Sequence, residues 1–107
     1  MKKVFVFPAI VLSLFWLCPG SAAQAADLSQ GKEAFVQHCA ECHPNGENMI
    51  NPAKTLHRKD LVANGLAKPA DIVGQMRNPG PGMPKFDAKT IPDEKARAIA
   101  EYILKTF

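Results

Sequence analysis

The sequence lacks the patterns of β-structure and of nucleic-acid binding. From Ala26 onward no strand-like alternation of polar and apolar residues reaches a useful length, and there are no repeats or low-complexity tracts. The sequence instead shows helical periodicity, interrupted by clusters of Gly, Pro and Asn. We therefore predict an all-α protein. There is also no Lys/Arg run and no interleaving of basic and aromatic residues, which excludes a nucleic acid as the expected partner.

Cysteine is scarce, with three residues, and Cys39 and Cys42 form the only C-x-x-C pair. A zinc site needs about four ligands and usually a second C-x-x-C or an H-x₃₋₅-H pair, but His38 and His57 do not stand at that spacing. A thioredoxin-like redox pair would need a βαβ context, which is absent. A disulfide between the two cysteines stays open in an exported protein, although it leaves the neighbouring His43 unexplained.

Residues 39–43 have the sequence C-A-E-C-H, and C-x-x-C-H is the attachment signature of a covalently bound c-type haem. In a helical turn, positions i, i+3 and i+4 lie on one face, so two thiols and one imidazole can converge on a single flat ligand. We expect Cys39 and Cys42 to form thioethers with the haem vinyl groups and His43 to be the proximal iron ligand. One haem c is therefore the predicted cofactor.

The N-terminal segment has the features of a secretory signal peptide. Two lysines form a basic n-region, residues 4–17 form an apolar run, and residues 23–25 are an A-x-A cleavage signal. The run is too short for a comfortable transmembrane helix, which needs about 20 residues. We predict removal of residues 1–25, which leaves residues 26–107 as one haem-binding domain, exported to the periplasm and without a membrane span.

Removal of this segment changes the charge and leaves a small domain. Two lysines and no acidic residue are lost, which lowers the formal net charge from +3 to +1, so the basic balance of the full chain says nothing about partners. A domain of this size has a marginal hydrophobic core, and small domains usually need additional stabilisation from a disulfide, a metal or a bound cofactor. We therefore expect haem attachment and folding to be coupled.

Cys18, at the end of the apolar run, is a candidate for lipid modification, which would keep the protein on a membrane. Trp16 and Leu17 precede it, where lipoprotein signals usually have small residues. Cleavage before Ala26 would remove Cys18 with the signal and leave no free thiol. A membrane lipoprotein anchored through Cys18 is therefore the alternative to a soluble periplasmic protein.

Four helices are predicted after the cleavage site. They are a first helix from near Ser29, short helices at about 58–64 and 69–77, and an amphipathic last helix at about 92–105. Gly65 is a natural stop for the second helix.

The first and last helices are expected to cross. Gly31 and Phe35 lie on one stripe of the first helix with Cys39, and a glycine inside a helix costs about 1 kcal/mol relative to alanine, which a close crossing would explain. We expect Tyr102 and its neighbours to lie against Gly31 and Phe35.

Residues 78–86, N-P-G-P-G-M-P-K-F, form the second informative stretch. Proline fixes φ and glycine admits unusual φ, so this composition defines a particular loop path and excludes a helix or a central strand. Met83 stands between Gly82 and Pro84. A methionine is usually core filler, but core filler seldom needs such a rigid mounting.

Together these features resemble a class I monohaem cytochrome c, most closely the cytochrome c6 (c553) family. The resemblance covers essentially all of residues 26–107. The matching residues, in order, are Ala26-Asp27-Leu28, Gly31, Phe35, Cys39 to His43, Asn48, Pro52, Lys54-Thr55-Leu56, Ile72, Gln75, Asn78, Met83-Pro84 and Tyr102. Glu47, Pro79 and Pro81 depart from the family pattern, which affects the expected partner and reduction potential but not the fold.

The resemblance implies a small class I cytochrome c fold, with about four helices around one covalently attached haem. It implies a monomeric one-electron carrier, not an enzyme, that exchanges electrons with transient redox protein partners. In that family the distal iron ligand falls on Met83, and residues near the haem fall on Pro52 and Gln75. His/Met ligation raises the reduction potential because the soft thioether favours the reduced ion.

Other residues are weaker candidates for the sixth ligand. Met76 lies beside Gln75 in a predicted helix and is expected in the core, and His57 is expected at the surface or at a helix start. His38 has no partner that the sequence identifies. For the free ring nitrogen of His43 we predict a backbone carbonyl acceptor in the Asn51-Pro52 region.

Two rival functions stay open at this point. In a haem enzyme or a gas or redox sensor, Met83 would be absent from the iron and the open distal site would bind a small molecule. In a fixed electron relay, lipidated Cys18 would hold the protein on a membrane.

Overall fold

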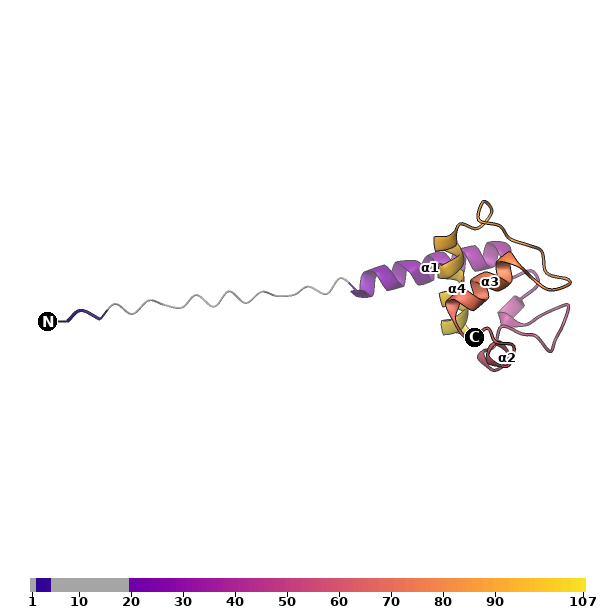
Figure 1. Ribbon diagram of the computed structural model, residues 1–107, viewed down its shortest axis with the longest axis horizontal. Coiled ribbons are helices and arrows are strands. Elements are labelled where there is room, and N and C mark those ends of the chain that lie inside the picture. The colour runs from indigo at the N-terminus through magenta and orange to yellow at the C-terminus, as the bar shows by residue number, and fades with distance from the viewer. Residues whose placement is uncertain (1, 5–19) are drawn as a thin grey trace.

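The computed structural model describes residues 2–4 and 20–107 of the chain. Cys18 and most of the predicted apolar run lie outside the described residues. Over residues 20–107 the protein is all-α, without strands, as predicted (Figure 1). The elements are α1 (Gly20–His38), the 3-10 helix η1 (Pro44–Gly46), α2 (Arg58–Ala63), α3 (Pro69–Arg77) and α4 (Asp93–Thr106).

The start of α1 differs from the prediction. The helix begins at Gly20 and not near Ser29, because the alanine-rich residues 20–26 are good helix formers and extend it towards the N-terminus. The proposed cleavage point before Ala26 therefore lies within this helix, and cleavage itself stays a prediction. Among the helices that the structure describes, none is both long enough and apolar enough to cross a membrane.

The later helices agree closely with their predicted ranges. Helix α3 has the predicted bounds, and α2 and α4 agree to within one residue. Gly65 follows α2 with a φ of 73°, the left-handed conformation that ends a helix and that glycine adopts without strain.

Helices α1 and α4 cross, as predicted (Figure 1). At Gly31 the two backbones are so close that a Cβ atom there would lie 2.7 Å from the carbonyl carbon of Ala98 and 3.0 Å from Cβ of Tyr102. One turn further along α1, the buried ring of Phe35 lies 5.4 Å, between centroids, from the ring of Tyr102. The close crossing explains why a helix interior carries glycine at this position.

Substitution of Gly31 should test this crossing. Gly31→Ala should lower the free energy of unfolding by about 1–3 kcal/mol, because the added methyl group meets the backbone of α4. The matched control is Gly74→Ala in α3, where no atom lies within 4 Å of the new Cβ. That change should instead stabilise the holoprotein by about 0.5–1 kcal/mol. Denaturant titration of both variants checks this, and effects of the same sign would contradict it.

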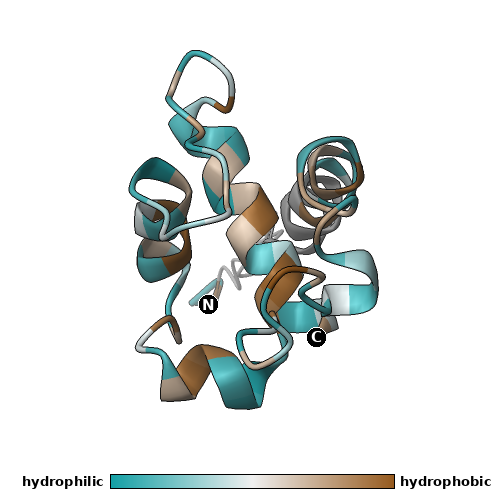
Figure 2. Cartoon of the chain, turned by 90° about the vertical axis from the view of Figure 1, so that its right-hand side faces the viewer, coloured by the Kyte–Doolittle hydropathy of each residue, from teal (hydrophilic) through white to brown (hydrophobic). Residues whose placement is uncertain are grey.

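One face of α4 forms the centre of the hydrophobic core. Four of the buried residues of α4 follow the predicted helical spacing, namely Ala96, Ile99, Ala100 and Ile103. The fifth, Ala98, lies at the crossing with Gly31. The residues that complete this core from the other segments are Ala34, Phe35, Leu61, Ile72, Met76 and Ile91. Figure 2 shows brown hydrophobic bands between teal hydrophilic ones along the helices.

Candidate haem site

A cavity of about 470 Å³ is formed jointly by the turn after α1, the loop before α2, helix α3 and the loop after α3. Its volume lies within the range of about 300–1,000 Å³ that is usual for ligand and cofactor sites. Among its lining residues are Cys39, Cys42, His43 and Met83, which sequence reasoning had selected. Its apolar lining includes Leu56, Leu61, Leu66, Ile72, Met76, Phe86 and Ile103.

The C-x-x-C-H segment extends α1 by one further turn. The N–H groups of Cys42 and His43 both donate to the carbonyl of Cys39, at 3.2 and 2.9 Å. This turn gives the i, i+3, i+4 arrangement expected from the sequence, and all three side chains line the cavity. Cys39 and Cys42 are free thiols, so the disulfide that the sequence left open is not formed.

The Cys39 thiol lies in an apolar environment. Burial, and to a smaller extent the nearby Cys42, raise its pKa to about 11. At neutral pH the thiol is therefore uncharged, which suits an apolar cavity wall. Conversion to a thioether would remove the titrating proton altogether.

His43 is oriented by a hydrogen bond that sequence reasoning placed incorrectly. Its Nδ1 lies 2.9 Å from the backbone carbonyl of Glu47, and not near the Asn51-Pro52 region. The reason is the tight turn η1, in which Asn45 and Gly46 adopt left-handed φ values of 55° and 77° and direct the chain back towards the ring. With Nδ1 donating to this carbonyl, Nε2 is left free to bind a metal.

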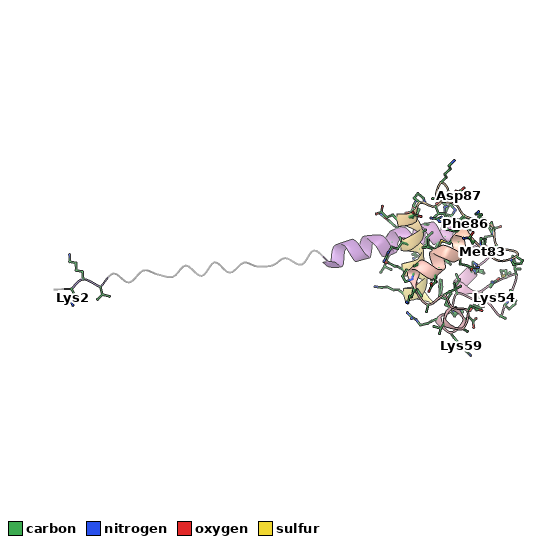
Figure 3. All side chains as sticks on the ribbon, viewed as in Figure 1. Lys2, Lys54, Lys59, Met83, Phe86 and Asp87 are labelled. Atoms are coloured by element: carbon green, nitrogen blue, oxygen red, sulfur yellow. The ribbon has the colours of Figure 1, made fainter. Side chains whose placement is uncertain are left out.

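Met83 lines the same cavity from the loop after α3. The preceding Gly82 has a φ of 91°, which side-chain-bearing residues rarely adopt, and a Cβ there would lie 3.1 Å from Cγ2 of Ile50. The positive φ therefore favours glycine here, and any other side chain would also require Ile50 to shift. Figure 3 labels Met83 in the half of the domain turned away from the N-terminal end.

Of the remaining residues predicted to lie near the haem, one lines the cavity and one does not. Gln75 lines the cavity from α3, and so does Met76, which is only 3% exposed and belongs to the core as expected. Pro52 is exposed and does not line the cavity. Its predicted role is therefore supported by the family resemblance alone.

The two other histidines differ in position. His57 does not line the cavity; its Nε2 lies 3.5 Å from Oε1 of Glu47, and its ring meets that of Phe107 edge-on, as expected for a partly exposed residue at a helix start. His38, whose partner could not be predicted, lines the cavity and meets the ring of Phe86 edge-on at 6.0 Å.

Sequence reasoning missed Asp60, which braces the loop of residues 48–56. Its carboxylate accepts hydrogen bonds from the hydroxyl and the N–H of Thr55, and the hydroxyl bond is the main cause that lowers its pKa. Asn48 braces the same loop by donating to the carbonyl of Lys54 at 2.8 Å. An acidic residue in the first turn of α2 was the available sequence signal, since helix N-termini favour negative charge.

Comparison with known proteins supplies the family. The model of a family described as cytochrome c oxidase, cbb3-type, subunit III matches residues 26–103. Cytochrome c6 of Rippkaea orientalis is 41% identical, over 94% of this chain and 84% of that protein. The chain belongs to the cytochrome c6 family of monohaem cytochromes c. A second relative, cytochrome c6 of a Synechocystis species, is 46% identical to this c6-family cytochrome over 79% of the chain and 70% of the relative.

Solved structures agree with this assignment. The outer membrane cytochrome OmcF of Geobacter sulfurreducens is 47% identical, with a TM-score of 0.71 over 72% of this chain and 98% of that one. Cytochrome c6 of the diatom Phaeodactylum tricornutum is 32% identical, with a TM-score of 0.65 over 74% and 92% of the two chains. The predicted fold is confirmed, and this c6-family cytochrome is an electron carrier and not an enzyme, as cytochromes c6 are.

Proposed function

We propose that this c6-family cytochrome carries one electron at a time, with a single haem c attached through Cys39 and Cys42 and with His43 and Met83 as the axial iron ligands. The observation that supports this is the convergence of two thiols, an imidazole and a thioether on one largely apolar cavity. When bound, the haem would supply an iron that alternates between the ferric and ferrous states.

Groups of the protein would keep the coordination of the iron nearly the same in both oxidation states. The Glu47 carbonyl holds the ring of His43 in a fixed orientation and raises its basicity. Met83, which follows Gly82, would supply a second permanent ligand. If His43 and Met83 both bind the iron, its coordination would change little between oxidation states and no position would be open to a substrate.

Electron exchange also requires a route between the cavity and a partner. Ile50 lines the cavity and is yet 60% exposed, and the adjacent Met49 is 69% exposed. An apolar surface therefore continues from the cavity to the solvent. We propose that redox proteins dock there transiently, in the small interfaces that weak electron-transfer complexes form.

The central test is a spectroelectrochemical titration of the purified holoprotein. We expect a single one-electron wave for each chain and a six-coordinate, low-spin spectrum in both oxidation states, because the same two ligands stay bound. A high-spin ferrous spectrum would contradict the proposal and favour a haem enzyme or a sensor with an open distal site.

We further propose that the protein is exported and works in the periplasm after removal of residues 1–25. The A-x-A signal supports this, and the family match begins at residue 26. The intact mass of the exported protein should equal residues 26–107 plus one haem. A diacylglycerol adduct on Cys18 would refute this and favour a lipid-anchored relay.

A further inference from the structure

A group of hydrogen bonds joins the two ends of the segment that carries Met83. We refer to residues 78–85 as the Met83 loop. The N–H of Phe86, just after this loop, donates to the carbonyl of Met76 at 2.9 Å. The guanidinium Nη1 of Arg77, just before the loop, donates to the carbonyl of Phe86 at 3.1 Å. Both hydrogen-bonding groups of the Phe86 backbone are thus used to close the base of the loop.

The same arginine is anchored to the last helix. Its Nη2 donates to Oδ1 of Asp93, in the first turn of α4, at 2.7 Å. The carboxylate is 87% exposed, so the ion pair itself adds little stability. The Arg77 side chain is only 20% exposed, however, and its planar fork directs one nitrogen to Asp93 and the other to Phe86. The hydrogen bond to Asp93 therefore orients the guanidinium group so that its other nitrogen reaches the carbonyl of Phe86.

The Met83 loop itself has few other supports. Most of its residues are exposed, no atom lies within 4 Å of a Cβ built on Gly80, and the Cβ of Gly82 would meet only Ile50. Segments with exposed backbone and few apolar contacts open locally at a low free-energy cost. The position of Met83 consequently depends on how firmly the base of its loop is closed.

We infer that Arg77 is a positioning residue for Met83, because it closes the base of the Met83 loop while Asp93 anchors it. Arg77 does not line the cavity, so it acts on the thioether only through the loop. This inference rests on the proposed function, since it requires Met83 to bind the iron.

The test compares three variants of the holoprotein. Arg77→Gln removes the guanidinium group. Arg77→Lys keeps the positive charge but provides one nitrogen for two acceptors, the Phe86 carbonyl and the Asp93 carboxylate. Arg97→Gln is the matched control, because Arg97 is a 71% exposed arginine of α4 whose partner is Glu101, at 3.4 Å. For each protein we would measure the rate of carbon monoxide binding to the ferrous form, the long-wavelength absorption band of methionine bound to ferric iron, and the helical circular dichroism.

Carbon monoxide can bind only after Met83 has left the iron, so its rate reports opening of the loop. Arg77→Gln should bind it about tenfold faster than the unmodified protein, the factor expected for loss of a hydrogen bond to a charged group. Arg77→Lys should be intermediate, and Arg97→Gln should be unchanged. The helical circular dichroism should be the same in all of them, because the opening is local.

Three results would overturn the inference. The first is a rate in Arg77→Gln, or in Arg77→Lys if the glutamine variant does not fold, equal to that of the unmodified protein. The second is a faster rate in Arg77→Gln accompanied by a loss of helical circular dichroism, which would mean that the substitution unfolds the domain and does not act on the loop alone. The third is absence of the methionine band in the unmodified protein, and this alone would also refute the proposed function.

Discussion

Replacing Met83 with alanine should open one axial position of the iron, and the ferrous protein should then bind carbon monoxide rapidly. The Met83 thioether would be the ligand lost, since this residue lines the cavity from the loop after α3. The reduction potential should fall by on the order of 0.1 V, a part of the roughly 0.8 V over which axial ligands tune haem potentials. Stopped-flow mixing and potentiometry would measure both effects.

Met76→Ala is the matched control for this change. Met76 also lines the cavity, but it is 3% exposed and lies within α3 as part of the core. Its truncation should cost about 2–5 kcal/mol of stability and leave the low-spin spectrum in place. If Met83→Ala left the spectrum unchanged, or if Met76→Ala opened the iron instead, the assignment of the distal ligand would be wrong.

Removing both cysteines of the haem motif should abolish nearly all covalent haem. Each thioether uses one sulfur, so Cys39→Ala or Cys42→Ala alone should leave haem held by a single bond, and the double variant should yield little holoprotein. Haem staining after denaturing electrophoresis measures the attached fraction. Because a small domain depends on its cofactor for stability, the double variant should also be poorly folded.

Cys18→Ala provides the control for a general effect of losing a thiol. It should leave the attached haem unchanged, since residues 1–25 are expected to be removed before the protein works. Full retention of haem by the Cys39, Cys42 double variant would refute attachment through this pair.

The helices were predictable where side-chain periodicity is strong. Residues 69–77 begin at a proline in the first turn and end before another, and the observed helix has the same bounds. The start of α1 was not predictable from Ser29, because a single N-cap preference is weaker than the summed helix propensity of the alanines before it.

The residues proposed to hold the haem could be predicted, but the contacts that support them could not. Cys39, Cys42, His43 and Met83 stand in motifs whose spacing or mounting is visible in the sequence, and one cavity brings them together. The acceptor for His43 depends on a left-handed Asn45, which is a rare conformation that spacing does not report.

The contact of Arg77 with Asp93 also could not be predicted from the sequence. The two residues are 16 positions apart along the chain, and they meet only because α3 and α4 lie side by side. No local pattern marks such a pair. A contact of this kind is found from the fold and not from the sequence.

The most direct test of the central claim is the reaction of the unmodified ferrous holoprotein with carbon monoxide. With His43 and Met83 both bound, the iron has no open position, so the low-spin spectrum should persist and carbon monoxide should bind slowly and weakly. Rapid, tight binding by the unmodified protein would contradict the account, because it would show an open distal site and identify a ligand-binding haem protein in place of an electron carrier.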